Sequence, residues 1–172
     1  MKTFFIADTH FHNENIIRYC NRPFANAAEM DEALINNWNS TISKQDMVFV
    51  LGDFAHRATK QNIIDLVLKL NGRKFLVLGN HDRVYKTSWW IKKSGFEEVS
   101  RFPILIENNL LLSHEPIFMN ETMPYVNVYG HVHNNDMYKD VSLHGICVSV
   151  ERINYTPLEL TELKDRLISL QG

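Results

Sequence analysis

Short apolar runs alternate with amphipathic stretches along the first half of the chain. Residues 3–7, 47–51 and 75–78 are apolar runs of strand length, and each one stops at a polar residue or a glycine turn. Residues 13–19, 29–42 and 60–70 separate or follow these runs, and in the longest of them Met30, Leu34, Trp38 and Ile42 recur every four residues, as on one face of a helix. The resulting β-α-β-α-β order predicts a sheet with helical crossovers.

The second half of the chain has a different pattern. Residues 104–107 and 110–113 flank Asn108 and Asn109, which predicts a tight hairpin, and residues 126–129 and 146–150 predict two further strands. Residues 156–159 match a capping box with proline at the first helical position, so a helix is expected to begin there. One stripe predicts its buried face: Leu160, Leu163, Leu167 and Leu170. No linker or repeat divides the sequence, so one domain is expected over residues 1–172.

Composition and charge narrow the functional classes. The formal charge of -2 argues against a strongly basic nucleic-acid-binding surface, although a local basic patch would not show in that total. Cys20 and Cys147 lie outside any CxxC pair, which is typical of reduced thiols. Asp8 and His10 interrupt the apolar start before a secretory signal could form, and no apolar run approaches the roughly 20 residues that cross a bilayer. A cytoplasmic protein without a membrane partner is therefore expected.

Polar residues follow the ends of five predicted strands. A single histidine after a strand is usually a surface or capping residue, and an isolated Gly-Asp pair is ordinary turn chemistry. Here, however, six of the eight histidines fall in such positions, and independent caps would not coincide in this way. Ligands of α/β sheets bind at the carboxyl ends of strands, so these side chains are expected to share one rim. They are Asp8, His10, Asp53, His56, Asn80, His81, Asp82, His114, His131 and His133.

This set of residue types suits a pair of metal ions. Two ions about 3.5–4 Å apart need a bridging carboxylate and further nitrogen and oxygen ligands. Imidazole suits Zn, Fe, Ni and Cu, whereas carboxylate and carbonyl oxygens suit Mn and Mg. His131 and His133 are two residues apart, so both can face the same side of an extended segment and supply one ligand to each ion.

The polar clusters also resemble the motifs of a known family, the calcineurin-like metallophosphoesterases. The family pattern is DxH, GDxxH or GDxxD, GNH(D/E), a single H, and GHxH, and all five motifs occur here in that order over residues 8–133. Because the flanking elements fit as well, the resemblance covers effectively the whole chain. The matching segments are Asp8-Thr9-His10, Gly52-Asp53-Phe54-Ala55-His56, Gly79-Asn80-His81-Asp82, Ser113-His114 and Gly130-His131-Val132-His133.

The resemblance implies a fold and a set of metal ligands. The fold would be a four-layer α/β/β/α sandwich of two mixed β-sheets flanked by helices. Two divalent ions would be bound, with manganese the first expectation and Fe, Zn, Ni or Mg compatible with the same ligands. The ligands would be Asp8, His10 and His133 for one ion, Asn80, His114 and His131 for the other, and Asp53 as the bridge.

The expected reaction is hydrolysis of a phosphate mono- or diester. Two cations lower the pKa of a bridging water, so that hydroxide can attack phosphorus in line near neutral pH. By the resemblance, His81 would donate to the phosphoryl oxygen or the leaving group, and Asp82 or His56 would orient it. No covalent nucleophile is required.

The substrate is less well defined by the sequence. Arg18 and Arg22 follow the first motif, and a guanidinium matches phosphate oxygens, so both are candidate substrate contacts; His12 could line the same pocket. A surface role is the alternative for each of the three. Short connections leave little room for a specificity cap, which favours a small, nucleotide-like phosphate ester. No stable nucleic-acid partner is expected, and a homodimer is compatible with a small open site.

Four alternative interpretations fit the sequence less well. His10-Phe11-His12 resembles the metal pair of amidohydrolases, but those barrels have about 250 residues. The HxHxDH element of metallo-β-lactamase-like hydrolases fails at Asn15. A nuclease of the same family generally carries extra domains. A non-catalytic scaffold of the same fold would lack stoichiometric metal, and the complete ligand set favours catalysis over it.

Overall fold

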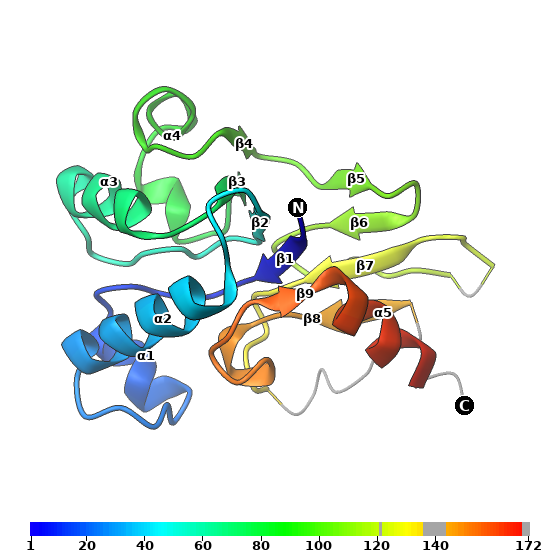
Figure 1. The fold of residues 1–172 in the computed structure, drawn as a ribbon, viewed down its shortest axis with the longest axis horizontal. Helices are drawn as coiled ribbons and strands as arrows, with labels where there is room; N and C mark the ends of the chain where they lie inside the picture. The colour runs from blue at the N-terminus through cyan, green and yellow to red at the C-terminus, as the bar shows by residue number, and fades with distance from the viewer. Residues whose placement is uncertain (121, 136–143, 170–172) are drawn as a thin grey trace.

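Two mixed β-sheets form the centre of the molecule, and helices flank them (Figure 1). The computed structural model describes residues 1–120, 122–135 and 144–169. The first sheet has the order β4-β3-β2-β1-β9; its first four strands in this order run parallel, and β9 is antiparallel to β1. Its strands are β1 (Thr3–Ile6), β2 (Met47–Val50), β3 (Arg73–Val77), β4 (Glu98–Ser100) and β9 (Leu158–Glu159).

The second sheet has the order β5-β6-β7-β8, in which β6, β7 and β8 are parallel and β5 is antiparallel to β6. Its strands are β5 (Ile104–Ile106), β6 (Leu110–Leu112), β7 (Val126–Tyr129) and β8 (Gly145–Cys147). The helical elements are α1 (Glu14–Tyr19), α2 (Ala27–Thr41), α3 (Lys60–Lys69), the 3-10 helix η1 (Asp82–Val84), α4 (Thr87–Lys93), the 3-10 helix η3 (Val150–Arg152) and α5 (Leu160–Ser169). The predicted arrangement of two mixed sheets flanked by helices is confirmed.

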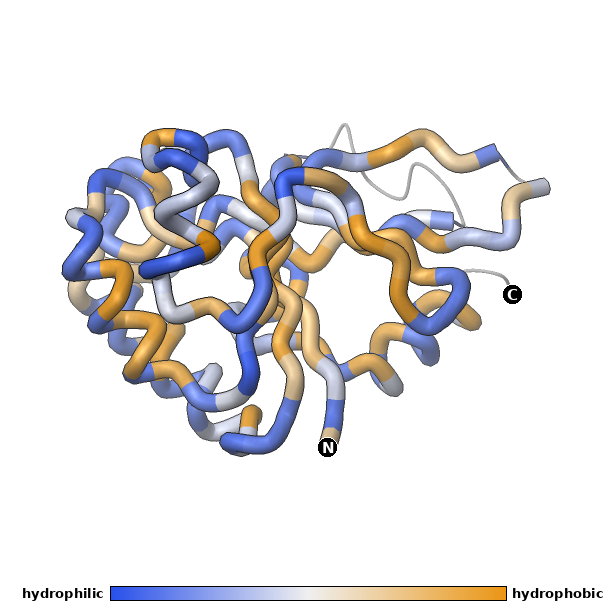
Figure 2. The backbone as a smooth tube through the Cα atoms, turned by 90° about the horizontal axis from the view of Figure 1, so that it is seen from above, coloured by the Kyte–Doolittle hydropathy of each residue, from blue (hydrophilic) through white to orange (hydrophobic). Residues whose placement is uncertain are grey.

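The strands form because their apolar residues are buried between the sheets and the helices. One core cluster takes side chains from both sheets, among them Phe4, Val50, Leu112 and Val128. Trp38 of α2 is fully buried, and its indole N–H donates to the Asn71 carbonyl at 2.9 Å, as expected for a core anchor. Hydrophobic segments accordingly recur along the central strands when the molecule is seen from above (Figure 2).

The two sheets are joined at the carboxyl ends of β1 and β8. Ala7, next after β1, forms a parallel bridge with Ser149, which follows β8. The Ala7 amide donates to the Val148 carbonyl at 2.9 Å, and the Val150 amide donates to the Ala7 carbonyl at 3.1 Å. The loops that leave the parallel strands of both sheets therefore meet beside Ala7.

Two expectations are corrected in detail, and two elements were not predicted. The terminal helix begins at Leu160, because Leu158 and Glu159 pair with β1 as β9 instead of entering the helix; Leu170 lies outside the described residues. The strand expected over residues 146–150 ends at Cys147, and Val150 begins η3. Neither β4 nor α4 was predicted. Within the described residues, no helix has the length and apolar character needed to cross a bilayer.

Candidate metal centre

The seven predicted metal ligands converge where the two sheets join. Each follows a parallel strand, and the strands belong to both sheets. Short distances link the whole set. The ligands are Asp8 and His10 after β1, Asp53 after β2, Asn80 after β3, His114 after β6, and His131 and His133 after β7.

Two groups of side chains can be distinguished within this set. The ligand atoms of Asp8, His10 and His133 all lie within 4.8 Å of one another, and the His10 and His133 rings stack with centroids 5.2 Å apart. On the other side, the Asn80 side-chain oxygen lies 2.9 Å from His114 Nε2 and 3.0 Å from His131 Nδ1. These groups contain the same residues as the two ligand sets that the family resemblance implies, and ligand atoms of Asp8, Asp53 and His114 also lie within 4.8 Å of one another across them.

Asp53 lies between the two groups. Its Oδ2 atom is 3.5 Å from His10 Nε2 and 3.6 Å from His114 Nε2. The same oxygen is 4.0 Å from His81 Nε2. One carboxylate thus reaches both sides of the centre.

The backbone of these loops takes an uncommon conformation. Five of the seven residues have positive φ without being glycine: Asp8 (57°), His10 (49°), Asp53 (52°), His131 (71°) and His133 (49°). Such strained residues cluster at functional sites, where the surrounding structure holds them in place. Here the left-handed turns direct successive side chains toward the junction of the sheets.

Several buried polar atoms of the centre have no hydrogen-bond partner within the described residues. They include Asp8 Oδ1 and both ring nitrogens of His10. Burial raises the pKa of Asp8, and burial together with neighbouring cationic groups lowers the pKa of His10 well below its usual range. Buried polar atoms are normally paired, so these point to a missing ligand. Oxygen and imidazole donors of this kind fit hard to borderline divalent metal ions.

An outer layer of residues fixes the imidazoles. His133 Nδ1 lies 3.0 Å from Glu151 Oε1, and His114 Nδ1 lies 2.8 Å from the Leu51 carbonyl, so the other nitrogen of each ring is left to face the centre. Burial opposes protonation of His133, but its hydrogen bonds with Cys20 and Glu151 outweigh this and raise its pKa to about 10. The same pairing lowers the pKa of the buried Glu151 to about 2.

Sequence reasoning missed Glu151 and Ser149. Ser149 donates its hydroxyl to Asp8 Oδ2 at 2.6 Å. Glu151 directly follows the strand expected over residues 146–150, so the strand-end rule pointed to it, whereas Ser149 lay inside that expected strand and carried no such signal.

The predicted substrate contact of Arg22 is corrected by the structure. The side chain is buried, and its guanidinium donates to the carbonyls of Asp8 (2.7 Å) and Thr9 (3.0 Å) and to Glu151 Oε1 (2.7 and 2.9 Å). Its donors are directed into the protein interior, so Arg22 supports the loop after β1 through the carbonyls of Asp8 and Thr9.

The other two candidate substrate contacts stay predictions. Arg18 is exposed on α1. His12 Nδ1 lies 2.8 Å from Asp31 Oδ2, and this hydrogen bond raises the pKa of His12.

His81 and His56 lie together at the mouth of the centre. The His81 side chain is 41% exposed, and its ring packs edge-on against His56 with centroids 4.5 Å apart. Burial, together with the nearby cationic groups of His81 and Arg57, lowers the pKa of His56, which favours its neutral form.

Asp82 does not have the predicted orienting role. It is fully buried, and its carboxylate accepts hydrogen bonds from the backbone amides of Asp53 (2.9 Å), Phe54 (3.1 Å) and Gly79 (2.8 Å). Burial and the nearby Asp53 charge raise its pKa to about 7. Asp82 therefore ties the loop after β2 to the loop after β3, and the ring that packs against His81 is that of His56.

Comparisons with known proteins agree with this geometry. A family model described as calcineurin-like phosphoesterase matches residues 1–169. An uncharacterized protein of Methanocaldococcus jannaschii is 36% identical over 166 residues, which cover 92% of this chain and 87% of that protein. The gene 66 protein of Mycobacterium phage L5 is 35% identical over 82 residues, which cover 46% of this chain and 39% of that protein.

A solved structure extends the comparison to three dimensions. A protein of unknown function from Aquifex aeolicus has a TM-score of 0.74 and 28% sequence identity, and the match covers 95% of this chain and 98% of that one. The family match covers both sheets and all the residues of the centre. The chain thus belongs to the calcineurin-like phosphoesterase family.

Proposed function

We propose that this chain is a phosphoesterase that hydrolyses phosphate mono- or diesters with two divalent metal ions. Asp8, His10 and His133 would hold one ion. A second set, Asn80, His114 and His131, would hold the other, with Asp53 contacting both. Manganese is the metal we propose first, because the set combines oxygen donors with imidazoles and contains no thiolate.

The observation that carries this proposal is the group of unpaired buried atoms between the two sheets. Asp8 Oδ1 and the two nitrogens of His10 have lost their hydration without gaining a protein partner within the described chain. Unpaired buried polar atoms destabilise a fold, and a protein that used this fold only as a scaffold would gain nothing from them. Bound cations would remove it.

When bound, such ions supply Lewis acidity, which activates water and neutralises charge on phosphoryl oxygens. The chain's own residues do the remaining work. Glu151 and the Leu51 carbonyl hold the His133 and His114 rings in orientation. His81 is exposed at the mouth, where its imidazole can give a proton to the departing oxygen, and the edge-on contact with His56 limits its rotation.

The test is hydrolysis of bis-p-nitrophenyl phosphate and p-nitrophenyl phosphate by metal-free chain reconstituted with Mn, Ni, Zn or Mg. We expect metal-dependent turnover, and the better substrate defines the diester or monoester preference. Asp53→Asn should lose both bound metal and turnover. His81→Ala should keep its metal and lose about 10²-fold in turnover, as for removal of one positioned proton donor. Asp165→Asn, an exposed carboxylate on α5, is the matched control and should behave as wild type.

The outcome that contradicts the proposal is equally clear. A chain that binds no metal by elemental analysis and turns over neither ester with any of the four ions would be a scaffold. Turnover that survives in Asp53→Asn would place the reaction elsewhere on the molecule.

A further inference from the structure

Two adjoining cavities beside the candidate metal centre are lined by cationic side chains over η1 and α4. Their volumes are about 410 and about 360 Å³, and Tyr85 and Lys86 line both of them. No Asp or Glu of the described chain is among their lining residues. We call the cations of these two cavities the basic surface: Lys60, Arg83, Lys86, Lys92, Lys93 and Arg101.

The basic surface continues into the candidate active site. A third cavity, of about 460 Å³, is lined by His56, Asn80 and His81, and it shares Tyr85 with both basic cavities. Arg83 lies near the loop after β6, because its guanidinium is 4.0 Å from the carboxylate of Glu115, the residue after His114. An anionic chain lying on the basic surface would therefore lead directly to the metal ligands.

These cations have few partners within the protein. Among the described residues, Arg83 is the one member of the basic surface with a carboxylate within 4.0 Å. Lys60 instead places its ammonium over the rings of Tyr85 (5.3 Å) and Trp89 (5.6 Å). The six residues are one third of the 18 lysines and arginines of a chain whose formal charge is -2. Such a concentration on one face is the electrostatic footprint of a polyanionic ligand.

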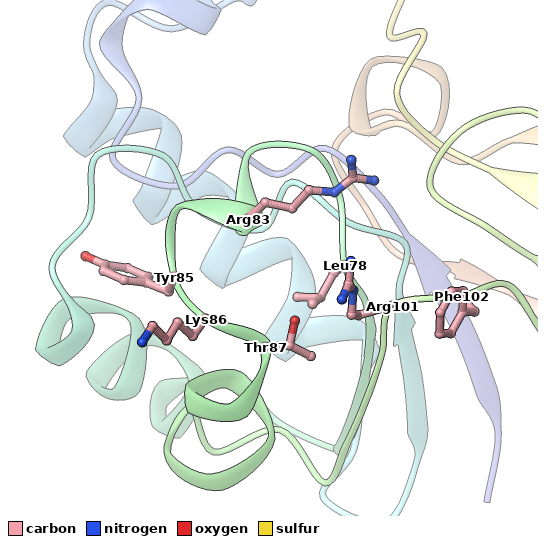
Figure 3. A pocket seen from close by; sticks show the side chains of 7 residues that line it. All are labelled: Leu78, Arg83, Tyr85, Lys86, Thr87, Arg101 and Phe102. Carbon is pink, nitrogen blue, oxygen red and sulfur yellow. The ribbon is translucent and has the colours of Figure 1, made fainter.

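Aromatic residues line the basic cavities together with the cations. Tyr85 and Trp89 line the basic cavities, and Phe102, next to Arg101, is 72% exposed. Figure 3 shows that these side chains come from separate segments, with Arg83 on η1, Tyr85 and Lys86 before α4, and Arg101 and Phe102 after β4. Phe102 is the exposed ring of this group, whereas Tyr85 and Trp89 are half-buried and pack against the core, with the Lys60 ammonium over both. An exposed ring beside cations suits single-strand binding, because an unpaired base can stack on it and a base inside a duplex cannot.

We propose that the basic surface binds single-stranded nucleic acid and leads one of its phosphodiester bonds to the candidate centre. The cleavage rests on the proposed function, whereas the binding does not. In the reaction, the oxygen of water forms a new bond to phosphorus, the bond from phosphorus to the departing ester oxygen breaks, and that oxygen takes up a proton. The small net charge, from which no stable nucleic-acid partner was expected, conceals this local concentration of cations.

Binding is tested without turnover, by fluorescence anisotropy of labelled oligonucleotides with the full chain in the presence of a chelator. Single-stranded DNA, single-stranded RNA and duplex DNA of about 12 residues suit a small binding surface. We expect both single strands to bind more tightly than the duplex. Lys86→Gln with Arg101→Gln should weaken binding about tenfold and lower the salt slope by about 1.4, since each lost phosphate contact removes about 0.7. Phe102→Ala should weaken binding about fivefold or more.

The matched control is Lys44→Gln with Lys164→Gln. It removes the same two charges from exposed positions outside the basic surface and should change the affinity less than twofold. Equal affinities of wild type and Lys86→Gln with Arg101→Gln would overturn the proposal, as would tighter binding of the duplex.

Hydrolysis of the labelled strands by the metal-loaded chain separates this inference from the proposed function. Binding of the strands without cleavage of any ester would support the basic surface as a nucleic-acid site and reject the proposed phosphoesterase activity. Hydrolysis of the small esters without oligonucleotide binding would support the phosphoesterase activity and reject the nucleic-acid site. Cleavage of the bound strand, reduced in the basic-surface variant but not in the control, is the result we expect.

Discussion

At Asp8, His10 and Asp53 the backbone takes a left-handed conformation that glycine adopts without cost and other residues rarely do. Each of these residues follows a strand that ends at the junction of the two sheets. At these turns the two carboxylates and the imidazole lie in one place. The sequence shows which residues are present but gives no sign of this turn, since none of the three is a glycine.

Arg22 shows how a residue of the correct type can be assigned to the wrong partner. Its position after the first motif and its guanidinium both suit a phosphate ligand. In the structure it is buried beneath the metal-site loop and paired with Glu151, which in turn contacts His133. Only the three-dimensional structure shows which way the side chain of Arg22 points.

Arg22→Met should destabilise the protein by about 3 kcal/mol. The substitution keeps the volume but leaves a buried carboxylate without its guanidinium partner, and breaking such a pair is strongly destabilising. Arg18→Met, at an exposed position nearby, should change the free energy of unfolding by less than about 0.5 kcal/mol. Denaturant titration of both variants measures the difference. An Arg22→Met variant of normal stability with a raised KM would restore the substrate role.

At the scale of elements, the loops after the strands carry the function, and close backbone approach shapes them. Gly52 has a φ of +86°, and a Cβ atom there would meet the His114 ring and lie 2.7 Å from the backbone of Gly79. The loops after β2, β3 and β6 are therefore packed against one another at this glycine. Their spacing holds Asp53, Asn80 and His114 in contact range.

Gly52→Ala should lower metal affinity at least tenfold, the effect of displacing a supporting contact. Gly95→Ala is the matched control, because its φ is +91° but its Cβ would lie 3.2 Å from the Val67 side chain, away from the centre. Both substitutions should cost about 1–2 kcal/mol of stability through the backbone alone. Titration of each folded variant with Mn against a competing chelator separates them. Equal metal affinities would show that the loops can adjust.

The amino ends of β1 and β2 are tied by a carboxylate whose effect depends on pH. Asp46 accepts hydrogen bonds from the Ser43 hydroxyl (2.7 Å), the Lys2 amide (2.7 Å) and the Ser43 amide (2.9 Å), which lower its pKa from 3.8 to about 2. Because the folded pKa lies below the unfolded value, the ionised carboxylate stabilises the fold above about pH 4. That contribution is lost as the pH falls toward 2.

Asp46→Asn should therefore be less stable than wild type at pH 7. The difference between the two proteins should narrow as the pH falls from about 4 toward 2, because the wild-type carboxylate becomes protonated there. Denaturant midpoints across this range give the measurement. A constant difference at every pH would show that Asp46 contributes through shape and not through charge.

For the whole molecule, the proposed metal ligands come from both sheets, so bound ions would link them. β1, β2 and β3 of the first sheet and β6 and β7 of the second all contribute. Within the described chain, the direct backbone connection at this place is the bridge of Ala7 with Ser149. Metal binding should consequently stabilise the fold as a whole.

Manganese at about 100 times its dissociation constant should stabilise the protein by about 2.7 kcal/mol. In a protein of this size this corresponds to a rise in Tm of about 5–10 °C. Thermal melts with and without the ion, in wild type and in Asp53→Asn, provide the test. An equal rise in both proteins would mean that the ion binds elsewhere.

The sequence by itself determined the main order of elements and the membership of the site. Strands β1, β2 and β3 are buried, so their apolar runs stand out, and the predicted bounds agree with the observed ones to within about two residues. The candidate site residues were found because each follows a predicted strand of one sheet or the other. The short strand β4, with its partly exposed residues, has no such pattern, and β9 exists because it pairs with β1.

Only the tertiary structure decided which way the side chains of the loops point and which residues they contact. The direction of a side chain at a loop depends on local φ and on long-range partners, which the sequence does not display. The inward turn of Arg22, the pairing of Glu151 with His133 and the gathering of cations around α4 all arise in this way. The net charge of a sequence does not show where on the surface its cations lie. The basic surface forms because β3 and β4 pair, which places the segments that follow them, with Arg83, Lys86 and Arg101, around one cavity.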